Sequence, residues 1–341
     1  DCTPHLVVAG PRSLVASAAS GIARGIPATV ARHRLPEVRR KVAELLAGGT
    51  FQVVHAEQLH SLAQTEPAEA FGIPVVHRAH NVESLLWAFA AQHRDFLTRA
   101  FFALEARRMS AWEARAVEST TCTVTLTEVD RGLLGEMVPD KTIFPIPAPF
   151  AAGLSAGPSG PTGSPAVVTL VSPSWAPSRA AVNELIREVW PGVRRRLPGA
   201  VLNVFGDADG LGREDGVAFH RSPDDSRTAF PAGAVVLVPA RHPTGVPMKA
   251  LEAWSRGLPL VVDAVSAEVL DAEDGVDALV AADDEGWASA LSRLVNEEGL
   301  WERVVAGGRR KLVERHDPTS VAGQLTRVYR RAIDNASSPS R

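Results

Sequence analysis

Residues 234–263 read AVVLVPARHPTGVPMKALEAWSRGLPLVVD, and the class of fold can be inferred from their pattern. It opens with an apolar, β-branched run at 234–239 and closes with another at 259–263. Between them lies a pattern at 247–256 whose apolar residues are spaced three and four apart, as in a helix. A strand, a helix and a second strand in this order form a βαβ unit, which predicts a parallel sheet.

Units of this kind recur along the chain in two series. The first series of predicted strands is 6–10, 51–57, 74–79, 121–127 and 141–146. The second is 167–172, 200–205, 217–220, 234–239, 259–263 and 278–282. Helical patterns lie near 36–47, 84–119 in one or two pieces, 178–196, 247–256, 285–296, 298–314 and 318–334. The sequence therefore predicts an α/β protein with two parallel sheets.

A segment that is rich in Pro, Gly, Ser and Ala separates the two series at 145–165, and it carries no charge and no periodic pattern. Such composition is typical of a linker. We therefore expect an N-terminal Rossmann-like domain at 1–146, a linker at 147–166 and a second Rossmann-like domain at 167–317. We expect the last helix, 318–336, to return to the first domain. A length of 341 residues suits two domains of ordinary size.

The composition excludes several classes of protein. The net charge is −3, and no basic excess favours nucleic acid as a partner. Cys2 and Cys122 form no spaced cluster, so neither a zinc site nor a disulfide framework is predicted. No apolar run is long enough to span a membrane and no leader pattern opens the chain, which predicts a cytoplasmic location. The preference for Arg over Lys suggests a high-GC bacterial genome.

The helix inside the opening stretch has the chemistry of an anion site at its start. Pro247 suits the first helical position, and Thr244 or Gly245 can cap the helix. The free N–H groups and the helix dipole there favour a diphosphate. Lys249 and Glu252 share one face, where Lys249 can neutralise phosphate and Glu252 can accept hydrogen bonds from ribose hydroxyls. The alternative is an ordinary capped helix with these two residues as a surface pair.

The same stretch resembles the donor-site motif of retaining GT-B glycosyltransferases of family 4, which reads roughly G-[ST]-G-x-x-x-K-x-L-E-A-x-x-x-G-x-P-V-V. The positions that match it are Gly245, Lys249, Leu251, Glu252, Ala253, Gly257, Pro259 and Val261. Many members have a second glutamate eight positions before Glu252, where this chain has Thr244, so one carboxylate near the transferred sugar is missing. Further similar segments follow the family order at 170–182, 194–206, 266–270 and 275–283.

The first domain also resembles this family. His80-Asn81-Val82-Glu83 is similar to the motif H-N-V-E, and Glu113 and 126–130 are similar to later segments. His80 follows a predicted strand, and ligands bind at the carboxyl ends of parallel strands. The alternative is a structural histidine that binds a backbone carbonyl in a turn. We expect His55 and His77 to be structural.

The resemblance implies a GT-B fold, in which two Rossmann-like domains with parallel sheets face a cleft. It implies a hexosyltransferase of polysaccharide or glycoconjugate biosynthesis, which moves a sugar from a nucleoside-diphosphate-sugar donor to a hydroxyl acceptor, with retention and without a metal or other cofactor. His80 and Lys249 are the implied catalytic residues, with His80 facing the cleft. The implied donor-binding residues are Ser174, Trp175, Arg221, Thr244, Gly245, Val246, Lys249 and Glu252.

Two other classes of function stay open. Thr244 and the short N-terminus also fit a catalytically silent homologue that binds a nucleotide or a partner protein. A GT-B epimerase or phosphorylase is the other alternative, although Lys249 and Lys311 are poor candidates for the pyridoxal-binding lysine of a phosphorylase.

The N-terminal region raises two further expectations. GT-B N-domains begin with a strand, a glycine-rich turn and a helix, whereas residues 1–15 resemble the region after that unit, so we expect the first strand to be missing. The basic residues of 31–41 predict peripheral contact with an anionic membrane at its inner face, and the alternative is a solvated surface. They are Arg32, Arg34, Arg39, Arg40 and Lys41.

Overall fold

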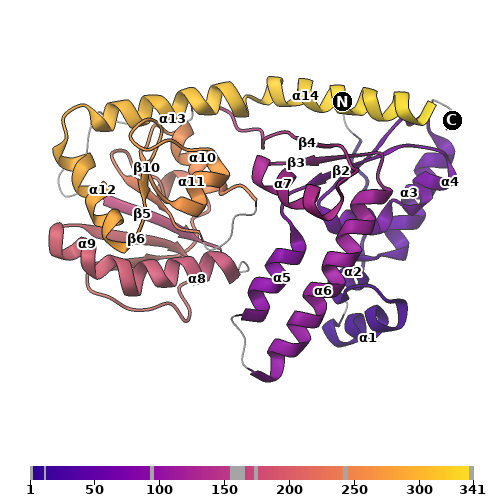
Figure 1. Ribbon diagram of the computed structural model, residues 1–341, viewed down its shortest axis with the longest axis horizontal. Coiled ribbons are helices and arrows are strands. Elements are labelled where there is room, and N and C mark those ends of the chain that lie inside the picture. The colour runs from indigo at the N-terminus through magenta and orange to yellow at the C-terminus, as the bar shows by residue number, and fades with distance from the viewer. Residues whose placement is uncertain are drawn as a thin grey trace. The chain divides into compact units, whose positions relative to one another are not determined.

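The computed structural model describes residues 3–10, 13–92, 96–153, 166–172, 176–240 and 245–337. It divides the chain into two compact units, which Figure 1 colours by residue number. Unit 1 comprises Asp1–Ile146 together with Ala322–Arg341, and unit 2 comprises Pro147–Val321. Each unit has its own parallel sheet, so the predicted α/β fold with two parallel sheets is confirmed.

Unit 1 is built on a four-stranded sheet in the order β1-β2-β3-β4. The strands are β1 (Val54–Glu57), β2 (Val75–Ala79), β3 (Cys122–Thr125) and β4 (Ile143–Pro145). All three pairings are parallel, and the register sets Ala56 beside His77 and Glu57 beside Arg78. Each of these strands lies inside a predicted one. The carboxyl ends of β1 and β2 therefore meet at one edge of the sheet.

Unit 1 also contains several helices. They are α1 (Leu14–Arg24), α2 (Ala28–His33), α3 (Pro36–Gly48), α4 (Glu66–Ala70), α5 (Glu83–Gln92), α6 (Phe96–Ser119) and α7 (Glu128–Met137), with a 3-10 helix η1 (Leu59–Gln64). The last helix, α14 (Pro318–Ser337), belongs to unit 1 from Ala322 onward. There the hydroxyl of Tyr329 lies 2.9 Å from Nδ1 of His55.

Two buried glutamates of α6 hold the starts of neighbouring helices. Oε2 of Glu105 accepts a hydrogen bond from the N–H of Ala28 at 2.6 Å, at the start of α2. Glu113 accepts from the N–H groups of Glu83 at 2.8 Å and Ser84 at 3.0 Å, at the start of α5. The first N–H groups of a helix lack partners inside the helix, and its dipole favours an anion there. These contacts fix α5, which begins three residues after His80.

The strand predicted at 6–10 is wrong. Residues 3–10 form no strand, and the side chains of Leu6 and Val8 are 95% and 93% exposed. The run has the composition of a buried strand, but no strand among the described residues pairs with it. A strand forms only where a neighbouring backbone satisfies its N–H and C=O groups, so composition alone did not decide the structure here.

Unit 2 is built on a six-stranded sheet in the order β10-β9-β8-β5-β6-β7, again fully parallel. The strands are β5 (Ala166–Val171), β6 (Val201–Gly206), β7 (Val217–His220), β8 (Val235–Val238), β9 (Leu260–Asp263) and β10 (Leu279–Ala281). From β5 the chain proceeds to β6 and β7 on one side, and from β8 to β9 and β10 on the other. The strand order therefore reverses between β5 and β8.

The helices of unit 2 pack on both sides of this sheet. They are α8 (Ala176–Glu184), a π-helical turn η2 (Leu185–Val189), α9 (Trp190–Arg196), η3 (Ser226–Thr228), α10 (Met248–Ser255), α11 (Ala264–Leu270), α12 (Asp284–Asn296) and α13 (Leu300–His316). Val235 and Leu237 join the core around Trp190, so the alternating Val236 and Val238 face the other side. All four are buried, as in a parallel sheet that is covered on both faces.

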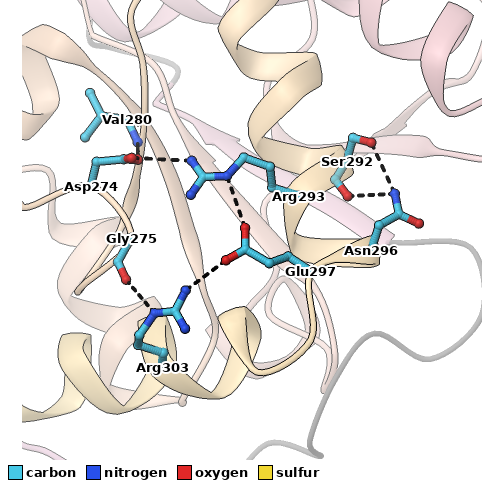
Figure 2. A network of polar contacts seen from close by, with 8 residues as sticks. All are labelled: Asp274, Gly275, Val280, Ser292, Arg293, Asn296, Glu297 and Arg303. Carbon is cyan, nitrogen blue, oxygen red and sulfur yellow. Dashed lines mark hydrogen bonds and ion pairs between the residues drawn. The ribbon is translucent and has the colours of Figure 1, made fainter.

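A polar network on the surface ties α12 to α13 (Figure 2). Arg293 of α12 lies 3.3 Å from Asp274 and 3.4 Å from Glu297, and Arg303 of α13 lies 3.0 Å from Glu297 and 3.1 Å from the carbonyl of Gly275. The charged side chains are 41–51% exposed. Exposed ion pairs stabilise a fold by about 1 kcal/mol or less, so this network orders the helix junction more than it stabilises unit 2.

Candidate active site

The reversal of strand order between β5 and β8 marks the place in unit 2 where a ligand is expected. In open α/β sheets, ligands bind outside the carboxyl ends of the strands at such a switch point. The chain leaves β5 at Ser172, and it leaves β8 through Pro239 and Ala240. Two of the implied donor residues, Ser174 and Trp175, follow β5, and Thr244 follows β8. These three lie outside the described residues.

A glycine brings the end of β6 close to this edge. Gly206 has a φ of +131°, and a Cβ atom placed on it would lie 2.1 Å from the carbonyl oxygen of Val171. No other residue fits so near a backbone atom. At this edge the backbones of β5 and β6 therefore approach each other with no side chain between them.

Helix α10 begins at the same edge, after β8. Gly245 is buried and has a φ of +73°, which favours glycine. The helix starts at Met248, so Pro247 occupies the N-cap position and not the first helical position that we predicted. Pro247 offers no side-chain acceptor to the first turn. The start of α10 therefore has the features of an anion site, with half-buried Val246 beside it.

Lys249 joins α10 to β5 across the switch point. Its Nζ donates a hydrogen bond to the carbonyl oxygen of Leu170 at 3.0 Å. Burial lowers the pKa of Lys249 to about 8, against the opposing charge of Asp263, so the side chain is still cationic at pH 7. The alternative of an exposed pair between Lys249 and Glu252 is wrong, because each side chain binds another partner.

Glu252 is held by an arginine that sequence reasoning missed. Oε1 of Glu252 accepts from Nε of Arg256 at 3.0 Å and from Nη2 at 2.7 Å. The same Nη2 donates to the hydroxyl of Ser226 at 3.0 Å, and the side chain of Arg256 is 7% exposed. Arg256 therefore connects α10 with the segment after β7. The i, i+4 spacing of a Glu and an Arg was the signal that predicts this pair.

Arg221 stands apart from these residues. It is exposed and directly follows β7, which is two strands away from β5. The strand order thus does not bring Arg221 to the switch point with Lys249.

Beside the switch point lies a pocket of about 230 Å³, lined in part by Ala240, Asp263, Asp283 and Trp287. Asp263, at the end of β9, accepts from the N–H of Ala240 at 2.5 Å and from the N–H of Ser266 at 2.7 Å. It therefore holds the loop after β8 and caps α11 at once. Asp263 was not among the residues predicted from the sequence, although an Asp directly before a helix is a capping signal.

In unit 1, His80 lies at the carboxyl edge of the sheet among other side chains. Its Nε2 is 2.5 Å from Oε1 of Glu57, and its Nδ1 is 3.4 Å from Nε2 of Gln58. Burial alone would raise the pKa of Glu57, but hydrogen bonds from His55 and His80 and the charge of Arg78 hold it well below its usual range. His80 thus contacts an ionised carboxylate and not a backbone carbonyl.

A second carboxyl group near His80 is shifted the other way. Burial raises the pKa of Glu83 to about 7, with a further contribution from the charge of Glu113 and an opposing one from His80. Neighbouring groups whose pKa values are shifted in opposite directions are typical of functional sites. Neither Glu57 nor Gln58 was predicted, because their contact with His80 joins two strands.

His77 lies within β2 and is 1% exposed. Both of its ring nitrogens lack a hydrogen-bond partner in the described structure. Burial lowers its pKa to about 3, so the ring is neutral. His55 binds Glu57 and Tyr329.

Within the described residues, no cluster of three or more His, Cys, Asp or Glu side chains is arranged to hold a metal ion. The described helices include none that is long and apolar enough to cross a membrane.

Comparisons with known proteins give one matching family model and several similar solved structures. Residues 165–297 match the family model described as Glycosyl transferases group 1. A comparison with curated protein sequences finds no match. Among solved structures, the chain is similar to sucrose-phosphate synthase from Thermosynechococcus elongatus, with a TM-score of 0.70, 16% identity and coverage of 88% of this chain and 78% of that one.

Two further solved structures are similar. HepE from Anabaena in complex with UDP-glucose gives a TM-score of 0.63 and 14% identity, over 86% of this chain and 82% of that one. A glycosyltransferase from Rickettsia africae gives a TM-score of 0.61 and 8% identity, over 87% and 81%. The likeness thus extends over both units, although the family model matches unit 2 alone.

Proposed function

We propose that this chain, a GT-B glycosyltransferase with a group 1 domain at 165–297, transfers a hexosyl-type sugar from a nucleoside diphosphate to a hydroxyl acceptor, with retention. One observation carries the proposal. The domain that matches the family places a cationic lysine, Lys249, at the switch point beside the start of α10. The similar HepE structure is a complex with UDP-glucose, which supports a nucleotide sugar as the donor of this chain.

The proposed chemistry needs no enzyme nucleophile. Lys249 and the backbone N–H groups near Gly245 stabilise the negative charge of the departing diphosphate, because a buried cation and a helix start both favour an anion. Glu252, held by Arg256, accepts hydrogen bonds from the ribose. His80 binds a hydroxyl of the sugar, since a neutral imidazole both donates and accepts. Orientation of donor and acceptor supplies the rest of the rate.

The remaining implied donor residues complete the proposal. Ser174, Trp175 and Thr244 follow β5 and β8 in the sequence and lie outside the described residues, and Val246 adjoins α10. Arg221 takes part only if the nucleotide extends along the sheet as far as β7. We propose that no metal is required, because Lys249 supplies the charge that a metal would otherwise bring to the diphosphate.

Release of nucleoside diphosphate tests this proposal. The chain is incubated with UDP-glucose, GDP-glucose and ADP-glucose, with and without EDTA, and the released diphosphate is measured. We expect release from one donor, unaffected by EDTA and strongly reduced in Lys249→Met. Binding of a donor without release favours the alternative of a silent homologue that binds nucleotides. If the chain neither binds a donor nor releases the diphosphate, both the proposed enzyme and the silent homologue are contradicted.

Contact with an anionic membrane, and with it a cytoplasmic location at the inner face, is a further part of the proposal. It rests on the basic run at 31–41. Arg34 and Arg39 reach Glu66, and Lys41 lies 3.3 Å from Glu44, which leaves fewer charges for lipid. Co-sedimentation with phosphatidylglycerol vesicles at low and high salt measures this contact.

A further inference from the structure

The polar cluster at the end of β1 shares one carboxylate between two histidines. Nε2 of His80 lies 2.5 Å from Oε1 of Glu57, and Nε2 of His55 lies 2.5 Å from Oε2. Nη1 of Arg78 lies 3.7 Å from Oε1. His55 and Glu57 are two apart on β1, and Arg78 lies beside Glu57 in the register, so one face of the sheet carries the whole arrangement. Three positively charged or donating side chains thus keep Glu57 ionised.

The contacts of His80 select one tautomer of its ring. An ionised carboxylate only accepts hydrogen bonds, so Nε2 of His80 carries the proton that it donates to Glu57. The amide nitrogen of Gln58 only donates, so Nδ1 of His80 is the acceptor of that 3.4 Å contact. Both contacts agree on a neutral ring with its proton on Nε2.

The two histidines differ in what binds their other ring nitrogen. Nδ1 of His55 lies 2.9 Å from the hydroxyl of Tyr329, which is a normal hydrogen bond and anchors this ring to α14. Among the described residues, Nδ1 of His80 has only the long contact with Gln58, and the side chain of His80 is 31% exposed. A ligand hydroxyl can replace a long hydrogen bond at little cost, so His80 and not His55 has an available acceptor.

The backbone at Gln58 supports the same arrangement. Gln58 has φ 67° and ψ 155°, a conformation that residues with a side chain rarely adopt. Its N–H donates to the carbonyl of Arg78 at 2.9 Å, which continues the pairing of β1 with β2 past the end of the strand. This pairing holds Gln58 in place, and the unusual turn directs its amide toward His80.

We propose that Glu57 and Gln58 are positioning residues that fix the His80 ring so that Nδ1 accepts a hydrogen bond from a hydroxyl of the transferred sugar. Glu57 sets the tautomer, and Gln58 occupies Nδ1 until the hydroxyl replaces it. The inference rests on the proposed function, because it assigns a partner to His80 in that reaction. It adds two residues that act through His80 and do not themselves touch the substrate.

Long-range proton–nitrogen NMR of the nitrogen-labelled chain tests the tautomer without any substrate. We expect His80 to carry its proton on Nε2 in the native chain, and the Glu57→Gln variant to show a mixture of tautomers. Kinetics with the sugar nucleotide that gives turnover should show kcat about 10- to 100-fold lower in Glu57→Gln, the range for one hydrogen bond to a charged group, with KM nearly unchanged. Gln58→Ala should lower kcat about 2- to 10-fold.

Tyr329→Phe is the matched control, since it removes the hydroxyl that binds Nδ1 of His55 and leaves the side chains of His80 and Glu57 unchanged. It should lower the thermal midpoint and leave the His80 tautomer and kcat unchanged. A protonated ring or an Nδ1–H tautomer of His80 in the native chain overturns the inference, and so does a tautomer shift in Glu57→Gln without a change in kcat. Lack of turnover with every donor counts against the proposed function, whereas the NMR result still decides the position of the proton.

Discussion

The two candidate regions hold their charged groups in different ways. In unit 2, Lys249 is half-buried and binds a backbone carbonyl of a central strand, and Glu252 is held by Arg256. In unit 1, His80 is half-buried and binds the side chains of Glu57 and Gln58. A cation held by a backbone carbonyl is suited to bind an anion, while a ring held only by side chains is suited to exchange hydrogen bonds. We therefore expect changes in unit 2 to affect nucleotide affinity and changes in unit 1 to affect turnover.

The largest effect is expected from Lys249. Replacing it with Met keeps the length of the side chain and removes its charge. Affinity for the nucleoside diphosphate should fall by about 1.5–3 kcal/mol, as for a lost hydrogen bond to a charged group, and Glu252→Gln should also weaken binding through the ribose. Isothermal titration calorimetry with UDP, GDP and ADP measures this change.

Lys311→Met is the control for Lys249→Met. Lys311 is also a largely buried lysine of unit 2, and it lies 2.6 Å from Asp277. Its loss should lower the stability of unit 2 and leave nucleotide affinity unchanged. Unchanged affinity in both Lys249→Met and Glu252→Gln would contradict a diphosphate pocket at α10.

The next effect is a loss of stability in acid that arises in unit 1. His77 stays neutral in the folded chain down to about pH 3, whereas an unfolded histidine binds a proton below about pH 6.5. Protons therefore favour the unfolded state over this window, and stability falls as the pH falls. Between pH 7.5 and 5 the loss should be about 2 kcal/mol. Urea unfolding followed by circular dichroism at the two pH values measures it.

His77→Leu should remove most of this pH dependence, because leucine binds no proton in either the folded or the unfolded state. His5→Gln, at an exposed histidine, is the control and should keep the native pH dependence. A pH dependence that persists in His77→Leu would assign the acid sensitivity to another group, for which His60, with a pKa lowered to about 4 by burial, is the next candidate.

His80→Ala is expected to separate turnover from stability. Turnover should fall about tenfold or more, because the lost contact acts mainly in the transition state, and nucleotide affinity should hardly change. Thermal unfolding and kinetics of the same preparation compare the two. A large drop in the thermal midpoint with normal activity of the folded fraction would show that His80 is a structural residue.

Two apolar runs show how far sequence reasoning reaches. Residues 6–10, LVVAG, and 166–171, AVVTLV, have almost the same composition. The second forms β5 between β6 and β8, whereas the first forms no strand. Composition reports that a segment can be buried in a sheet, but a neighbouring strand must be present to pair with it.

The remaining strands and the long helices were predicted from apolar runs and helical spacing. Helices α1, α2, α4, α7 and α11 were not predicted, and the shortest of these have about two turns or fewer, which is too short for a periodic signal. The predicted fold is confirmed by the similar solved structures, and residues 165–297 match the family model described as Glycosyl transferases group 1.

The candidate site was predicted only in part. Lys249, Glu252 and His80 were singled out because they stand in linear motifs. Their partners Leu170, Glu57 and Gln58 come from other strands, and no local pattern links them. The domain boundaries and the roles of the site residues remain predictions that the experiments above address.

The smallest effect is expected from Arg256, and it tests whether unit 2 uses side-chain positioning as unit 1 does. Arg256→Ala removes two hydrogen bonds to Glu252 and one to Ser226. If Arg256 orients Glu252 toward the ribose, affinity for UDP should fall by about 1 kcal/mol, while affinity for a dideoxy analogue without ribose hydroxyls should stay the same. Arg256→Lys should keep the charge but lose the forked geometry, and give an intermediate value. Equal losses for UDP and its dideoxy analogue would show that Arg256 only stabilises unit 2. In that case positioning by a paired side chain would be confined to Glu57 and His80 in unit 1.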